Sequence, residues 1–94
     1  MYFITTVRTI ETDVDDQRCV GYYKHYNAAH TKVMDNSCDI FEDGYYRYAV
    51  IIKVSQGLYP DKDEIQWFEC DEHGGITTIE RPDFLDRWYP YTIG

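Results

Sequence analysis

Carboxylates gather in four short stretches of this sequence. The chain holds 17 Asp and Glu residues against 9 Lys and Arg, a formal net charge of −8. Carboxylates spaced several ångströms apart can resemble a run of phosphates, so they predict binding to the basic cleft of a nucleic-acid-binding protein. The residues expected to carry this charge are Asp13, Asp15, Asp16, Asp61, Asp63 and Glu64. The other two clusters are Asp39/Glu42/Asp43 and Glu69/Asp71/Glu72.

Several of these clusters are expected in loops that could share one edge of a sheet. A solvated rim that keeps an aromatic-rich protein in solution is the alternative interpretation. The same acidity excludes direct binding to nucleic acid and to anionic membranes, because like charges repel.

Aromatic residues are the second unusual feature, with 10 Tyr, 4 Phe and 2 Trp. Exposed rings can stack on a base while arginines hold its phosphates, which predicts a nucleotide pocket as the alternative site. Its residues would be Tyr46, Tyr48, Trp67, Trp88, Arg47 and Arg81. Packing of these rings between the sheet, the end of the chain and a second copy is the competing interpretation.

Cysteine and histidine offer one suggestive pair, Cys70 and His73. Zinc would need two further ligands, and a nucleophilic thiol would need an orienting group as well as a base. His25 and His30 are five residues apart, which is not the spacing of a helical zinc pair. We therefore predict no metal, no cofactor and no enzymatic activity.

Length and composition indicate one folded domain covering residues 1–94, with 44% apolar residues. Three cysteines without motif spacing fit reduced thiols in a cytoplasm better than a disulfide framework. The start of the chain lacks the features of a signal peptide, and no apolar run approaches the length of a membrane span.

The segment 44–54 organises the expected fold, because it is the longest β-branched and aromatic run. With a period of two, Tyr46, Tyr48 and Val50 share one strongly apolar face, and Ala49 and Ile51 share a mixed one. Further strands are expected at 2–10, 18–23, 65–70 and 76–80.

A helix is predicted at 26–35, since its apolar residues recur at helical spacing. Asn27 could cap it, and Asn36 follows as a stop. The order β-β-α-β-β-β predicts an α+β fold, an antiparallel sheet of four to five strands with one short helix packed on one face. The aromatic tail 82–94, a second copy in a homodimer or a partner would cover the face that carries Ala49 and Ile51.

The runs Gly44-Tyr-Tyr-Arg-Tyr-Ala-Val-Ile, Gly57-Leu-Tyr-Pro and Trp67-Phe carry a resemblance. The chain resembles a group of small stand-alone proteins encoded by gut bacteria, their phages and mobile elements. No activity is assigned to that group, so the resemblance implies no site residues. It implies a phage-associated accessory protein in the cytoplasm of a bacterial host.

Two functions are therefore expected. The first is a non-enzymatic inhibitor that binds a host defence protein through acidic, nucleic-acid-mimicking loops, as an anti-CRISPR protein would. The second is a sponge that sequesters a nucleotide immune signal in the aromatic and arginine pocket, at an oligomer interface.

Overall fold

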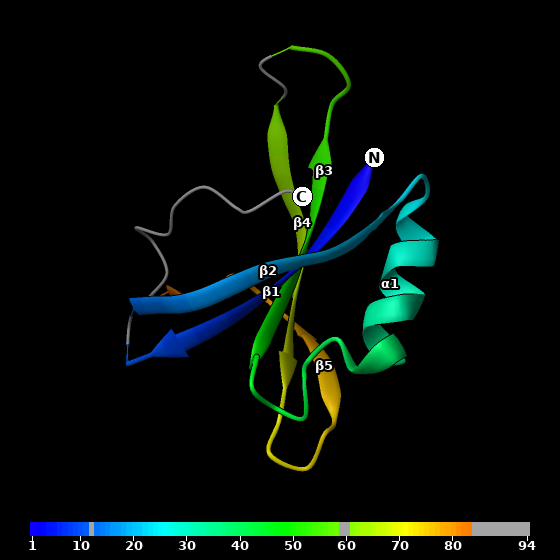
Figure 1. The fold of residues 1–94 in the computed structure, drawn as a ribbon. Helices are drawn as coiled ribbons and strands as arrows, with labels where there is room; N and C mark the ends of the chain where they lie inside the picture. The colour runs from blue at the N-terminus through cyan, green and yellow to red at the C-terminus, as the bar shows by residue number, and fades with distance from the viewer. Residues whose placement is uncertain (12, 59–60, 84–94) are drawn as a thin grey trace.

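A computed structural model of the chain describes residues 1–11, 13–58 and 61–83, and it shows a five-stranded antiparallel sheet with one helix (Figure 1). The elements are β1 (Tyr2–Ile10), β2 (Asp13–Tyr23), α1 (Tyr26–Met34), a 3₁₀ turn (Ser37–Asp39), β3 (Tyr48–Val54), β4 (Lys62–Cys70) and β5 (Ile76–Ile79). The strand order is β2-β1-β3-β4-β5. The predicted α+β class and element order are confirmed.

Strands β1 and β2 form a long hairpin whose second strand begins earlier than predicted, at Asp13. Its register shifts between Ile4 and Thr5, where Gly21 and Cys19 are the successive partners. This is a β-bulge beside Gly21, the kind of irregularity that a glycine within a strand indicates.

Strand β3 is shorter than predicted and begins at Tyr48. The period of two therefore does not extend back to Tyr46, which belongs to the cluster of Ala49 and Ile51, while Tyr48 belongs to that of Val50. The prediction that Tyr46 shares a face with Tyr48 is wrong, because the chain turns between residues 41 and 45 before the strand starts.

Helix α1 packs on the face of the sheet that carries Ala49, Ile51 and Phe68, through its buried residues Ala29 and Val33. The prediction that this face needs another cover is therefore wrong. The helix covers this face of the sheet within one chain. The homodimer remains a prediction, and this buried face does not support it.

The termini of the helix match one prediction and contradict another. His25, not Asn27, is the residue before the first turn, and no side chain caps that turn. Asn36 has a left-handed backbone (φ 47°), so it ends the helix as predicted.

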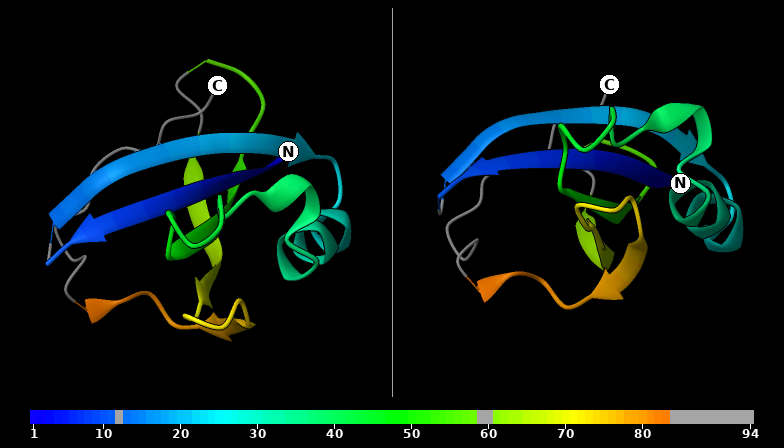
Figure 2. Two further views of the ribbon diagram at one scale, coloured as in Figure 1. Left: turned by 60° about the horizontal axis from the view of Figure 1, so that its bottom comes forward. Right: turned by 90° about the horizontal axis from the view of Figure 1, so that it is seen from below.

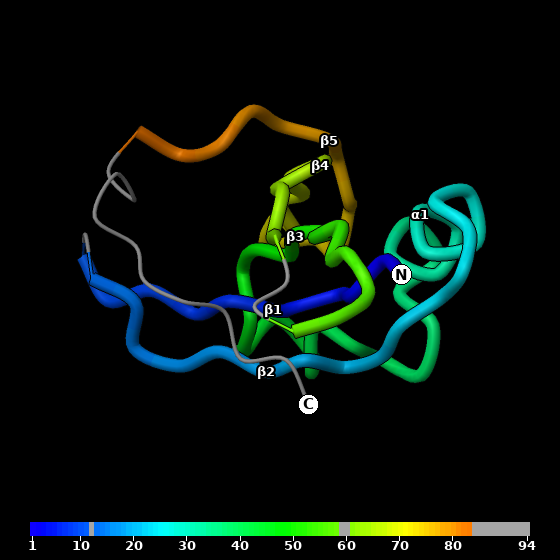
Figure 3. Tube along the Cα trace, turned by 90° about the horizontal axis from the view of Figure 1, so that it is seen from above, coloured from blue at the N-terminus to red at the C-terminus, as the bar shows by residue number. Residues whose placement is uncertain are grey.

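The opposite face of the sheet is also buried, because the sheet curls (Figure 2). Val14 from one edge strand and Ile79 from the other both pack against the cluster of Val50 and Trp67. Residues 80–83, which follow β5, run toward the side of the molecule where the β1–β2 hairpin ends (Figure 3). Of the predicted tail, only Pro82 and Asp83 lie within the described residues.

Candidate functional site

The acidic clusters lie at two opposite ends of the sheet. In the antiparallel register, Val7 of β1 pairs with Tyr48 and Tyr2 pairs with Lys53. The hairpin turn after β1 therefore lies near the start of β3, and Asp61 to Glu64 lie near its end, ~20 Å away along the strand. The six predicted carboxylates do not form one surface.

Several of these carboxylates also lie in strands rather than loops. Asp13, Asp15 and Asp16 belong to β2, and Asp63 and Glu64 belong to β4. The loop prediction is wrong for these five, because the hairpin strands extend further than their β-branched runs. Asp61 does precede a strand, where its backbone N–H donates to Ser55 Oγ (2.9 Å).

The carboxylates of β2 tie the hairpin to the segment before β3. Asp15 Oδ2 lies 3.1 Å from Arg8 Nε, and the Arg8 guanidinium lies 4.4 Å from the centre of the Tyr45 ring. Asp16 Oδ2 accepts hydrogen bonds from the hydroxyls of Tyr45 (3.1 Å) and Tyr46 (3.3 Å). Asp15 and Asp16 therefore hold the hairpin against the segment before β3.

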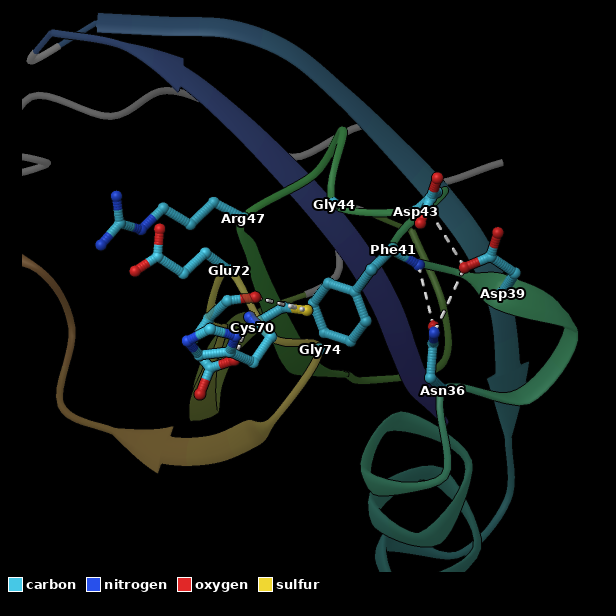
Figure 4. A pocket seen from close by; sticks show the side chains of 11 residues that line it. Asn36, Asp39, Phe41, Asp43, Gly44, Arg47, Cys70, Glu72 and Gly74 are labelled. Carbon is cyan, nitrogen blue, oxygen red and sulfur yellow. Dashed lines mark hydrogen bonds between the residues drawn. The ribbon is translucent and has the colours of Figure 1, made fainter.

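A hollow of about 870 Å³ opens at the same end of the sheet, between the segment 36–44 and the turn that joins β4 to β5 (Figure 4). We call it the acidic hollow. Its lining residues are Asn36, Asp39, Phe41, Asp43, Gly44, Arg47, Cys70, Asp71, Glu72, His73 and Gly74.

The charge of the acidic hollow is strongly negative. Asp39 and Asp43 lie on one side, and Asp71 and Glu72 on the other. Its arginine, Arg47, is already paired with Glu69 on β4, since Nε and Nη2 both lie 2.7 Å from the same carboxylate oxygen. Within residues 1–11, 13–58 and 61–83, none of those four carboxylates forms a salt bridge, and Glu72 interacts with the charge of Arg47 at longer range. The arrangement suits a cationic group.

Asp71 is held in place by the turn that it begins. Its Oδ1 accepts the backbone N–H groups of His73 and Gly75, each at 2.8 Å. These two donors, first that of Gly75 and then that of His73, hold the pKa of the Asp71 carboxyl below its ordinary value. Asp71 therefore stays ionised and fixed in orientation.

Gly75 leaves the space that this carboxylate fills, because a Cβ at Gly75 would lie 2.7 Å from Asp71 Oδ2. Gly75→Ala should push the carboxylate away from its two donors and raise the pKa of Asp71 toward its ordinary value. An NMR titration of the side-chain carboxyl carbon measures this. Gly21→Ala is the control, since nothing lies within 4 Å of its Cβ position. An unchanged Asp71 pKa in Gly75→Ala would contradict the role of the turn.

The segment 36–44 has an unusual backbone. Its left-handed residues are Asn36 (φ 47°), Cys38 (56°), Asp39 (53°), Glu42 (49°), Asp43 (55°) and Gly44 (87°). Asn36 Oδ1 accepts the N–H of Phe41 (3.1 Å), and Asp39 Oδ1 accepts the N–H of Asp43 (3.1 Å). The fully buried Phe41 ring anchors the segment to the core. These contacts hold the acidic side of the hollow in one conformation.

The predicted nucleotide pocket is not assembled by the described residues. Tyr46, Tyr48 and Trp67 are 4%, 7% and 3% exposed, so their faces are not open to a base. Tyr46 also lies on the other side of the sheet from Tyr48. Trp88 lies outside the described residues.

Both arginines of that predicted pocket have acidic partners. Arg47 is paired with Glu69, and Arg81 Nε lies 3.3 Å from Glu64 Oε1. The same Glu64 oxygen accepts the indole N–H of Trp67. Glu64, predicted for the acidic surface, is thus joined to two residues predicted for the nucleotide pocket.

Cys70 lies under the acidic hollow as a thiol. Burial, and then the charge of Asp71, raise its pKa, which is the opposite of what activates a nucleophile. Within residues 1–11, 13–58 and 61–83, no group of three or more His, Cys, Asp or Glu could hold a metal ion. In that same part of the chain, no helix has the length and apolarity needed to cross a membrane.

Comparisons with protein-family models, with curated proteins and with solved structures found no match to this chain. The candidate site therefore rests on the geometry of the acidic hollow.

Proposed function

We propose that this protein binds a basic partner protein through the acidic hollow, and that the partner is a nucleic-acid-binding defence protein of a bacterial host. The observation that supports this is that Asp39, Asp43, Asp71 and Glu72 all line one hollow, Asp39 and Asp43 from the segment 36–44 and Asp71 and Glu72 from the turn after β4. In a chain of net charge −8, such a surface attracts and orients a basic cleft.

The alternative, a nucleotide sponge, has less support. A nucleotide would bring phosphates toward four carboxylates, and the described rings that would stack its base, Tyr46, Tyr48 and Trp67, are buried. Arg47 would also have to leave Glu69 to bind a phosphate. A cationic protein surface meets none of these obstacles.

The test compares charge removal at the two ends of the sheet. The variant Asp43→Asn/Asp71→Asn/Glu72→Gln removes charge from the acidic hollow, and Asp61→Asn/Asp63→Asn/Glu64→Gln is the matched control at the other end. Each is titrated against purified nucleic-acid-binding effectors of bacterial defence systems by biolayer interferometry at low and high salt.

We expect the first variant to weaken binding by about tenfold or more, with most of the salt dependence lost. The control variant should bind within about threefold of the wild type, since it lies ~20 Å from the hollow. Equal loss in both variants would indicate a general charge effect, and no loss in either would refute the proposal.

A further inference from the structure

Strand β5 is a short sheet edge that carries no charged residue of its own. Ile76–Ile79 pairs with β4 on one side, and within the described residues no strand pairs with its outer side (Figures 1 and 3). All of its residues, Ile-Thr-Thr-Ile, are β-branched and uncharged, in a chain that is 28% charged. Such an edge can pair with a strand of another chain.

The other edge strand, β2, is protected against pairing with a strand of another chain. Its register with β1 is interrupted at two places, and it carries Asp13, Asp15, Asp16 and Arg18. The segment before β3 also binds it, through Tyr45 and Tyr46 on Asp16 and through Glu42 on Arg18 (3.3 Å). Irregularity and charge discourage strand pairing there.

The outer backbone groups of β5 can be assigned from its register. Asp71 N–H donates to Gly75 O (2.9 Å), and Glu69 pairs with Thr77. Because inward and outward groups alternate along an antiparallel edge strand, Thr77 and Ile79 bond to β4, and Ile76 and Thr78 point their N–H and C=O groups outward.

The side chains of β5 leave room for a further strand on both faces. Ile76 packs at the margin of the helix-side cluster, and Ile79 packs at the margin of the opposite one. Both are only half-buried, so an added strand would cover each of them. The acidic residues Asp71, Glu72 and Glu80 flank the strand at its two ends.

We propose that β5 is the docking edge for an extended, basic segment of the partner, which adds to the sheet as a sixth strand. Its backbone bonds to Ile76 and Thr78, and its cationic side chains reach Glu72 at one end and Glu80 at the other. This inference rests on the proposed function for the basic character of the partner, and it adds the mode of binding.

The experiment uses a short peptide of alternating lysine and valine as the probe, with alternating glutamate and valine as its charge control. Binding to the full chain is followed by NMR shifts and by hydrogen exchange of the Ile76 and Thr78 amides. Thr78→Pro removes the outward N–H at a position where an edge strand tolerates proline. Thr78→Val, which keeps the amide and the branched side chain, is the matched control.

We expect the lysine peptide to slow exchange at both amides, and Thr78→Pro to weaken its binding by about tenfold while Thr78→Val leaves it unchanged. If Thr78→Pro does not fold, the exchange rates of the Ile76 and Thr78 amides in the wild type show whether the peptide adds to β5. Peptide binding that shifts only the acidic hollow, without protecting Ile76 and Thr78, would overturn strand addition and leave the proposed function intact. Equal protection by the glutamate peptide would overturn the basic partner, and absence of protection by either peptide would overturn the edge itself.

Discussion

Phe41→Ala is expected to lower the free energy of unfolding by about 3–5 kcal/mol, the usual cost of removing a buried phenylalanine ring. Phe41 is 0% exposed and packs with Val33, Ile51 and Phe68 in the helix-side cluster. The same ring anchors the left-handed segment 36–44, so its loss should also disorder the Asp39 and Asp43 side of the acidic hollow. Urea unfolding measures the first effect, and amide shifts of residues 36–47 report the second.

Leu58→Ala provides the control for this change. Leu58 is 92% exposed in the loop after β3, so its truncation should alter stability by less than about 0.5 kcal/mol. If Phe41→Ala loses less than about 1 kcal/mol, the ring is not the anchor of the segment.

Alkaline pH is expected to unfold the protein cooperatively. Burial raises the pKa of Tyr46, Tyr48 and Cys70, and the negative charge of Asp16 adds to the effect at Tyr46. Each folded pKa lies above the unfolded value, taken as 10.0 for Tyr and 9.0 for Cys. The stabilisation is therefore complete below those values and is lost as pH rises through the folded pKa.

The slope of this loss can reach ~1.4 kcal/mol per pH unit for each group while the pH lies between its unfolded and folded pKa. Circular dichroism should therefore be lost above about pH 10, and the part of the tyrosinate absorbance that is missing in Tyr46→Phe should appear together with that loss. Tyr46→Phe removes one titrating group and should flatten the loss. Tyr22→Phe, on a side chain that is 62% exposed, should leave the profile unchanged. If the absorbance difference between the wild type and Tyr46→Phe appears well before unfolding, the Tyr46 hydroxyl is accessible in the folded protein.

The element order was predictable because it depends on local patterns. The β-branched run of β3, the helical spacing of Ala29 and Val33, and the glycines of the β4–β5 turn each indicate one element without reference to the rest. The faces of the sheet were less predictable. Tyr46 lies on the opposite side from Tyr48 because residues 41–45 form turns and β3 begins only at Tyr48, and the continuous aromatic and β-branched run gives no signal of that start.

The acidic hollow was only partly predictable. Asp39, Asp43, Asp71 and Glu72 stand out as clusters, and the antiparallel order places the start of β3 beside the end of β4. Asp61, Asp63 and Glu64 lie far from the acidic residues of β2. Strand register decides which end of a sheet a turn occupies, and composition alone does not reveal that register. One available signal was overlooked: Asn36, Asp39, Asp43 and Gly44 are the residue types that adopt left-handed backbone most readily.

The left-handed backbone of segment 36–44 lowers the stability of the fold at positions that also line the acidic hollow. Each non-glycine residue held at positive φ costs about 1 kcal/mol or more relative to glycine, and five of them lie between Asn36 and Asp43. Glycine at Asp39 or Asp43 would relax the backbone, but it would also remove a carboxylate from the acidic hollow. Under the proposed function, backbone relaxation and binding of a basic partner therefore place opposite demands on Asp43, while Asp39 also keeps its hydrogen bond to the Asp43 N–H.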